Sequence, residues 1–153
     1  MPCNPESEAR KKHIVSLLES HLGSLDRNRP HRLDWYSSKN RKVEIFITDS
    51  KAHFNQRPWF DMKFSDIKEL AEHPAGFIIF VLGDDNNYLV IPAKDLNSEL
   101  PNHNERMTED GRYHFNIVLG KKGFKQLPDW NLHQYQNKIE LISSLMDKLF
   151  QFN

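Results

Sequence analysis

The segment FIIFVLGDDNNYLVIPA, Phe77–Ala93, decides the fold class of this 153-residue chain. Two almost continuous apolar runs flank the polar residues DDNN, which is the pattern of a β-hairpin. A strand that is apolar at nearly every position needs cover on both faces of its sheet. The sequence therefore predicts a hairpin in a sheet that other elements cover on both sides.

Three further extended segments precede this hairpin. RLDWYSS (32–38) and KVEIFIT (42–48) are joined by a short basic turn, so we expect them to pair as a second hairpin. In KVEIFIT the odd-numbered residues from Val43 face one side, and the even-numbered residues from Glu44 face the other. RPWFDM (57–62) is predicted to be a short third strand, with its proline at an edge or a strand start.

Helices are predicted at both ends of the chain and between the strands. The first spans residues 4–25, with Asn4 as its cap. Shorter helical segments are expected at 64–76 and 93–100. Residues 130–152 are predicted to form one long amphipathic helix, with apolar residues recurring every three or four positions: Leu132, Tyr135, Ile139, Ile142, Met146 and Leu149.

This order of elements predicts an α+β (mixed α/β) fold. We expect a single domain over residues 1–153, with a central mixed or mostly antiparallel sheet and the N-terminal and C-terminal helices packed on it. The chain contains no repeat, linker or low-complexity tract. It is either complete or the N-terminal DNA-recognition part of a larger protein, and both interpretations stay open.

Composition excludes several classes of protein. The only cysteine is Cys3, so no internal disulfide framework is available. The N-terminus lacks an apolar signal core, and no stretch approaches the ~20 apolar residues of a membrane helix. We therefore expect a cytoplasmic protein without a membrane partner.

Charge is distributed unevenly although the net charge is zero. Residues 27–63 carry nine Lys or Arg and four Asp or Glu, a local charge of +5 that leaves −5 for the rest of the chain. Such asymmetry indicates nucleic-acid contact, and chance clustering of surface charge is the competing explanation.

The basic and aromatic loop at residues 49–60 is the main candidate for DNA contact. Cations bind phosphates, amide and guanidinium groups pair with base edges, and aromatic rings stack on bases. The alternative is that Trp59 and Phe60 are core anchors and that the cations only make the loop soluble. The predicted DNA-binding residues are Arg41, Lys42, Lys51, His53, Asn55, Gln56, Arg57 and Trp59.

The order helix–strand–strand–strand–helix–strand, with Asp34 in RLDWY and Glu44 in KVEIF, resembles the PD-(D/E)XK restriction-endonuclease-like superfamily over residues 8–96. The resemblance implies that Asp34 and Glu44 hold Mg²⁺, and that a lysine two positions after the second acid acts on the attacking water. In this chain Phe46 occupies that position. Family members are known to relocate this lysine, and Lys42 or Lys51 could take its place. Without such a replacement, the resemblance implies a DNA-binding scaffold that has lost hydrolysis. A pseudo-barrel recognition domain of a restriction enzyme is the alternative scaffold.

Three functions remain open at this point. The first is a DNA-recognition module of a restriction or defence-type system, which contacts double-stranded DNA through residues 49–60 and needs no cofactor. The second is an active Mg²⁺-dependent endonuclease with Asp34 and Glu44 as metal ligands and catalytic residues. The third is a protein-interaction or regulatory domain, in which helix 130–152 docks a second copy or a partner protein. For the two acids and the helix, solvated strand carboxylates and core packing are the simpler explanations.

Overall fold

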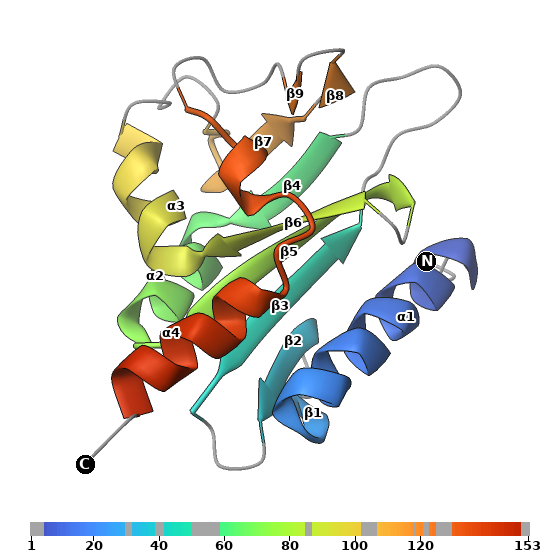
Figure 1. Ribbon diagram of the computed structural model, residues 1–153. Coiled ribbons are helices and arrows are strands. Elements are labelled where there is room, and N and C mark those ends of the chain that lie inside the picture. Colours follow the sequence, from blue (N-terminus) through green and yellow to red (C-terminus); the bar gives the residue numbers. More distant parts are fainter. Residues whose placement is uncertain are drawn as a thin grey trace.

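The computed structural model describes residues 5–29, 32–38, 42–49, 59–84, 87–101, 107–117, 119–120, 123–124 and 130–150 (Figure 1). It confirms the predicted α+β fold. The elements in chain order are α1 (Pro5–Leu22), β1 (Leu25–Arg29), β2 (Arg32–Ser38), β3 (Glu44–Asp49), β4 (Trp59–Lys63), α2 (Phe64–Glu72), β5 (Gly76–Asp84), β6 (Asn87–Pro92), α3 (Ala93–Glu99), β7 (Arg112–Asn116), β8 (Leu119–Gly120), β9 (Gly123–Phe124), the 3₁₀ turn η2 (His133–Tyr135) and α4 (Glu140–Phe150).

A five-stranded mixed sheet forms the centre of the structure, with strand order β1-β2-β3-β5-β6. All neighbours in it are antiparallel except β3 and β5, which are parallel. The predicted hairpin of β5 and β6 pairs Ile79 with Val90, and the hairpin of β2 and β3 pairs Tyr36 with Ile45. Both predicted hairpins are therefore confirmed.

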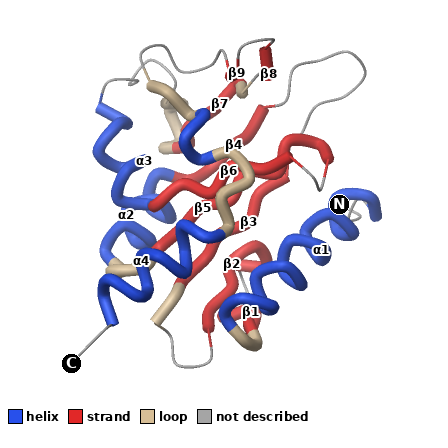
Figure 2. Tube along the Cα trace, viewed as in Figure 1, coloured by secondary structure: helices blue, strands red, loops and turns tan. Residues whose placement is uncertain are grey.

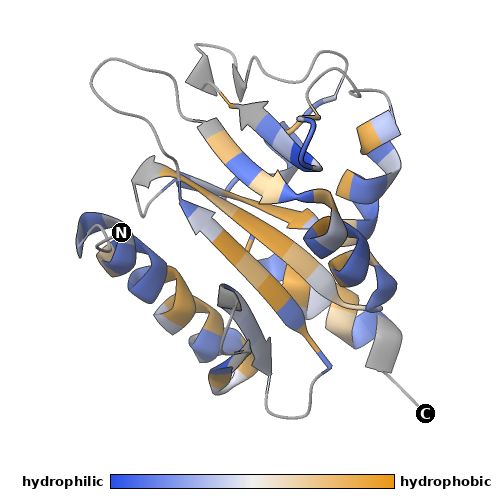
Figure 3. Ribbon diagram, turned by 180° about the vertical axis from the view of Figure 1, so that it is seen from behind, coloured by the Kyte–Doolittle hydropathy of each residue, from blue (hydrophilic) through white to orange (hydrophobic). Residues whose placement is uncertain are grey.

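The sheet is covered on both faces, as the apolar runs require (Figure 2). On one face, here called the α1 face, helices α1 and α4 pack over residues such as Phe77 and Ile79. On the opposite face, here called the β4 face, α2, α3 and the strand pair β4–β7 pack over Ile78 and Phe80. Figure 3 shows continuous hydrophobic colour along the central strands that lie between these layers.

Helix α1 ends earlier than the apolar spacing predicted. Gly23 follows its last residue with φ of 80°, and its N–H donates to the Glu19 carbonyl at 2.9 Å. Glycine adopts this left-handed conformation without a Cβ penalty and so terminates the helix. Leu25 therefore begins strand β1, which the sequence pattern did not indicate, and Asn4 lies outside the described residues.

The third predicted strand is not part of the main sheet. β4 pairs instead with β7 in a two-stranded antiparallel sheet, here called the ribbon. Its inner side chains alternate with polar ones, and Phe60 packs edge-on against Phe80 with ring centroids 5.0 Å apart. The ribbon is therefore a second layer on the β4 face.

The prediction of one helix over residues 130–152 is wrong. Leu132 and Tyr135 are buried on the β4 face, whereas Ile139 and Ile142 are buried on the α1 face. Asn137, with φ of 51°, lies between the two pairs and breaks the helical path. The residues of the apolar repeat therefore pack on two opposite faces of the sheet. Helix α4 begins only at Glu140.

The segment around Asn137 also closes the edge of the main sheet at β6. The Asn137 N–H donates to the Tyr88 carbonyl at 2.8 Å, and the Tyr88 N–H donates to Asn137 Oδ1 at 2.9 Å. A bridge between Leu89 and Gln136 extends this contact. Exposed strand edges can pair with other chains, so this closure protects the sheet.

Tyr135 anchors the 3₁₀ turn η2 to helix α3. Its hydroxyl donates to Asp95 Oδ2 at 3.0 Å, and its ring meets Trp130 edge-on at 5.9 Å. Burial, with the neighbouring Asp95 carboxylate, raises the pKa of Tyr135 to about 12. The phenol thus stays protonated in the folded protein where an unfolded chain would already ionise it.

No helix within the described parts of the chain combines the length and the apolar character needed to cross a bilayer.

Replacing Asn137 tests the closure of the β6 edge. Asn137→Ala should lower the free energy of unfolding by about 2 kcal/mol, because it loses one hydrogen bond and adds left-handed strain. Asn137→Gly tolerates the backbone conformation and should lose only about 1 kcal/mol. Urea unfolding measures both, and an equal loss in the two variants would show that the backbone conformation carries no cost.

The tyrosine anchor predicts a specific alkaline response. Tyr135→Phe should lower the free energy of unfolding by about 1 kcal/mol near neutral pH, because the bond to Asp95 is lost. Below the ordinary pKa of 10 that contribution of Tyr135 is fully present. It is lost as the pH rises toward about 12, so the difference between wild type and variant should shrink. A constant difference in urea unfolding across this range contradicts the assignment.

Candidate nucleic-acid interface

The two acids proposed as metal ligands lie on opposite faces of the main sheet. Strand register places Ser37 opposite Glu44 and Trp35 opposite Phe46, so these side chains share one face. Asp34 precedes Trp35 on the same strand and therefore points to the other face. There it accepts a hydrogen bond from Lys11 of α1 at 2.7 Å.

Glu44 is a buried structural carboxylate on the β4 face. Glu44 is only 2% exposed, and its Oε1 accepts hydrogen bonds from Trp35 Nε1 and Ser37 Oγ, both at 2.8 Å. Phe46, in the position of the family's lysine, packs against the β4-face core. Asp34 and Glu44 therefore do not form a shared Mg²⁺ site. The described residues contain no group of three or more His, Cys, Asp or Glu that could hold a metal ion.

Ion pairs join helix α1 to the strands of the basic segment. Arg10 binds Asp49, which lies at the end of β3. Its Nε donates to both carboxylate oxygens at 3.1 Å, and its Nη2 donates to Oδ2 at 2.5 Å. The Asp49 side chain is only 2% exposed, so this pair fixes the strand end from which the candidate loop departs. Arg27 of β1 forms an ion pair with Glu8 of α1 at 3.3 Å. Its Nε also donates to the Tyr36 hydroxyl at 3.0 Å, and this bond raises the pKa of Arg27.

Most of the predicted DNA-binding residues fall in parts of the chain that the structure does not describe. Lys42 is exposed just before β3, and Trp59 begins β4 opposite Asn116. The remaining predicted residues lie outside the described residues: Arg41, Lys51, His53, Asn55, Gln56 and Arg57. The structure thus shows where the loop begins and ends, at Asp49 and Trp59, and which surface adjoins its far end.

That surface is the outer side of the ribbon. Asp61 and Lys63 of β4 alternate with the buried Phe60 and Met62, and lie opposite His114 and Arg112 of β7. We call these four residues the ribbon outer face: Asp61, Lys63, Arg112 and His114. The alternation in WFDMK and RYH is visible in the sequence, but only the pairing of β4 with β7 brings the three basic residues together.

The charges on the ribbon outer face are arranged around its one acid. Arg112 Nε donates to both oxygens of Asp61, at 2.8 and 2.9 Å, and His114 Nε2 lies 3.6 Å from Oδ1. The Lys63 side chain is exposed, as is that of His114. Asp61 therefore orients the arginine. The exposed Asp110 adjoins this surface, because Arg112 and His114 are among the groups that lower its pKa.

Comparisons with known proteins identify no relative. No family model, curated protein or solved structure matches this chain. Function must therefore be inferred from the side chains that the fold brings to the surface.

The separation of the two acids predicts unequal costs of their removal. Glu44→Ala should lower the free energy of unfolding by about 2–4 kcal/mol, because it leaves buried donors of Trp35 and Ser37 without their acceptor. Asp34→Ala removes one partner of a partly exposed ion pair and should cost less than about 1 kcal/mol. Urea unfolding gives both values. If Mg²⁺ raises the Tm of the wild type and either substitution abolishes this increase, the two acids share a metal site after all.

Proposed function

We propose that this chain is a DNA-binding recognition module without catalytic activity of its own. It contacts duplex DNA through the ribbon outer face together with the basic loop 49–60. The main support for this proposal is the pairing of β4 with β7, which brings Lys63, Arg112 and His114 to one surface. Strand β4 directly follows the loop. The loop leads directly into β4 along the chain, so both would contribute to one contact region.

The geometry of the ribbon suits this role. A two-stranded antiparallel ribbon has the dimensions to enter the major groove, and several DNA-binding proteins use one in this way. Lys63 and Arg112 stand on neighbouring strands, where their charges can contact phosphates. Arg112 donates to Asp61 through Nε, so its terminal nitrogens, Nη1 and Nη2, would donate to a phosphate. The loop residues Asn55, Gln56 and Arg57 would contribute contacts to base edges.

Two features of the structure weigh against the alternative functions. An endonuclease that uses Asp34 and Glu44 together would need both carboxylates on one side of the sheet, and they lie on opposite faces. A docking role for the C-terminal helix would need an exposed apolar stripe. Ile139 and Ile142 are instead buried against the chain's own core. The setting in a restriction or defence-type system is part of the proposal and rests on the sequence resemblance alone.

DNA binding should be electrostatic and should depend on the ribbon. In fluorescence anisotropy with a labelled duplex, the Kd should rise steeply with salt. The double variant Lys63→Ala/Arg112→Ala should reduce the slope of log Kd against log salt by about 2, because each lost phosphate contact contributes about 0.9.

The matched control is Lys94→Ala/Lys148→Ala, which removes the same charge from the exposed surfaces of α3 and α4. It should leave the slope almost unchanged. A third variant, Lys51→Ala/Arg57→Ala, measures the contribution of the loop. Binding that ignores salt, or an equal loss in the control, refutes the proposed interface. Parallel titrations with modified and unmodified duplexes identify what is recognised.

A further inference from the structure

His114 is the residue of the ribbon outer face that can gain or lose a charge near neutral pH. It lies opposite Asp61 in the strand register, and its side chain is 46% exposed. Its Nε2 is 3.6 Å from Asp61 Oδ1, which already accepts a hydrogen bond from Arg112 Nε. Histidine is the side chain that ordinarily changes its charge between about pH 5 and pH 8. The charge of the surface proposed to contact DNA therefore depends on this residue.

The charged groups around His114 come from β4, from β7 and from the turn that precedes β7. Asp61 faces it from β4, and Arg112 stands on the same side of β7. Asp110 belongs to the turn. A hydrogen bond from Thr108 is the main cause of the lowered pKa of Asp110, and the positive charges of Arg112 and His114 add to it. Asp110 is therefore close enough to His114 to feel its charge.

Without a proton on His114, the described charges of this surface balance. Two basic and two acidic groups contribute to it: Lys63, Arg112, Asp61 and Asp110. The turn also carries the exposed Glu109, so the turn adds only negative charge. A proton on His114 adds one positive charge among these groups. Protonation therefore shifts the surface toward the sign that attracts a phosphate backbone.

We propose that duplex binding is linked to a proton on His114, and that the protonated imidazole is a third phosphate contact beside Lys63 and Arg112. This inference deepens the DNA-binding proposal and rests on it. A phosphate oxygen beside the ring favours the protonated imidazole, because opposite charges attract. The contribution of His114 is complete at acidic pH, where the free imidazole is already protonated. It is lost at alkaline pH, where the bound imidazole has lost its proton as well.

Fluorescence anisotropy with a labelled duplex, at about pH 5.5 and about pH 8, tests this linkage. The Kd of wild type should be about fivefold lower at the acidic pH, and the slope of log Kd against log salt should be larger by about 0.9. His114→Gln cannot be protonated and should lose both differences. His114→Lys carries a fixed charge and should show the larger slope at both pH values.

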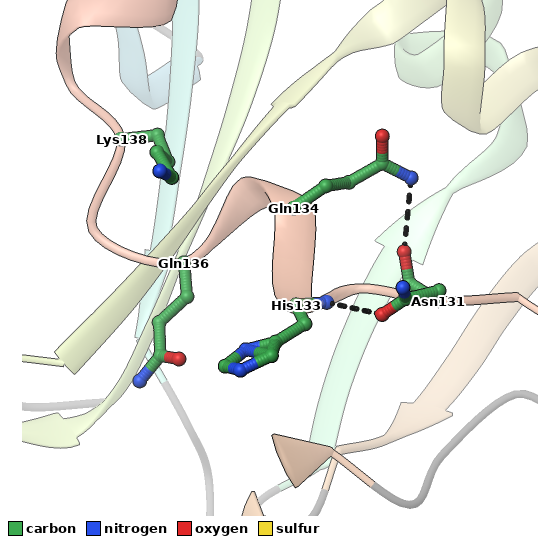
Figure 4. Close-up of a pocket in the computed structure, with 5 residues that line it drawn as sticks. All are labelled: Asn131, His133, Gln134, Gln136 and Lys138. Atoms are coloured by element: carbon green, nitrogen blue, oxygen red, sulfur yellow. Dashed lines mark hydrogen bonds between the residues drawn. The ribbon is translucent and has the colours of Figure 1, made fainter.

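Two other exposed histidines serve as matched controls. His133 lies on η2, and its described neighbours in the surface hollow there are Asn131, Gln134, Gln136 and Lys138 (Figure 4). His21 lies at the end of α1, across the main sheet. His133→Gln and His21→Gln should keep the pH dependence of wild type. Because His53 belongs to the proposed loop, wild type and His114→Gln are also compared after His53→Gln is added to both.

The outcomes separate this inference from the function on which it rests. A pH dependence that His114→Gln leaves intact overturns the proton linkage, and so does a Kd that is the same at both pH values. Duplex binding itself then stands. A wild type that binds duplex at neither pH overturns both proposals.

Calorimetric titration of the duplex in two buffers of different ionisation enthalpy measures the proton directly. Wild type should take up a fraction of a proton on binding near neutral pH, and His114→Gln should take up less. Equal uptake by the two proteins contradicts the assignment to His114. Urea unfolding at both pH values verifies that each variant is folded.

Discussion

The parallel pairing of β3 with β5 is the constraint on which the rest of the structure depends. Parallel neighbours cannot be joined by a tight turn, so the chain between β3 and β5 needs a crossover, of which the structure describes residues 59–75. This crossover carries β4 and α2 onto the β4 face, and β7 then joins β4 there. The opposite face is left for α1 and α4, and both faces of the apolar central strands are thereby buried.

The same constraint determines which side chains become available for binding. The crossover starts at Asp49, which Arg10 holds against helix α1, and its first strand presents an alternating polar side to solvent. On the α1 face, acids of residues 27–63 pair with cations of helix α1, Asp34 with Lys11 and Asp49 with Arg10. The ribbon and the 3₁₀ turn η2 both pack on the β4 face.

Much of the secondary structure could be predicted from local pattern. The hairpin of β5 and β6 followed from two apolar runs around a polar turn, and the alternation in β3 correctly divided its side chains between two faces. The C-terminal segment could not be predicted in this way. An apolar repeat of three and four has the same appearance whether its residues meet one surface or, as at Leu132 and Ile142, two opposite surfaces.

By itself the sequence determined the fold class, the buried hairpin and the basic, aromatic character of residues 49–60, because these depend on composition and short-range periodicity. Only the tertiary structure decided which separated residues share a surface. Strand register and side-chain alternation put Asp34 and Glu44 on opposite faces although they are near in sequence. The pairing of β4 with β7 brought Lys63 and Arg112 together across a long stretch of chain. Side-chain direction in a sheet changes with each residue, so contact between distant strands follows from register, which local sequence does not specify.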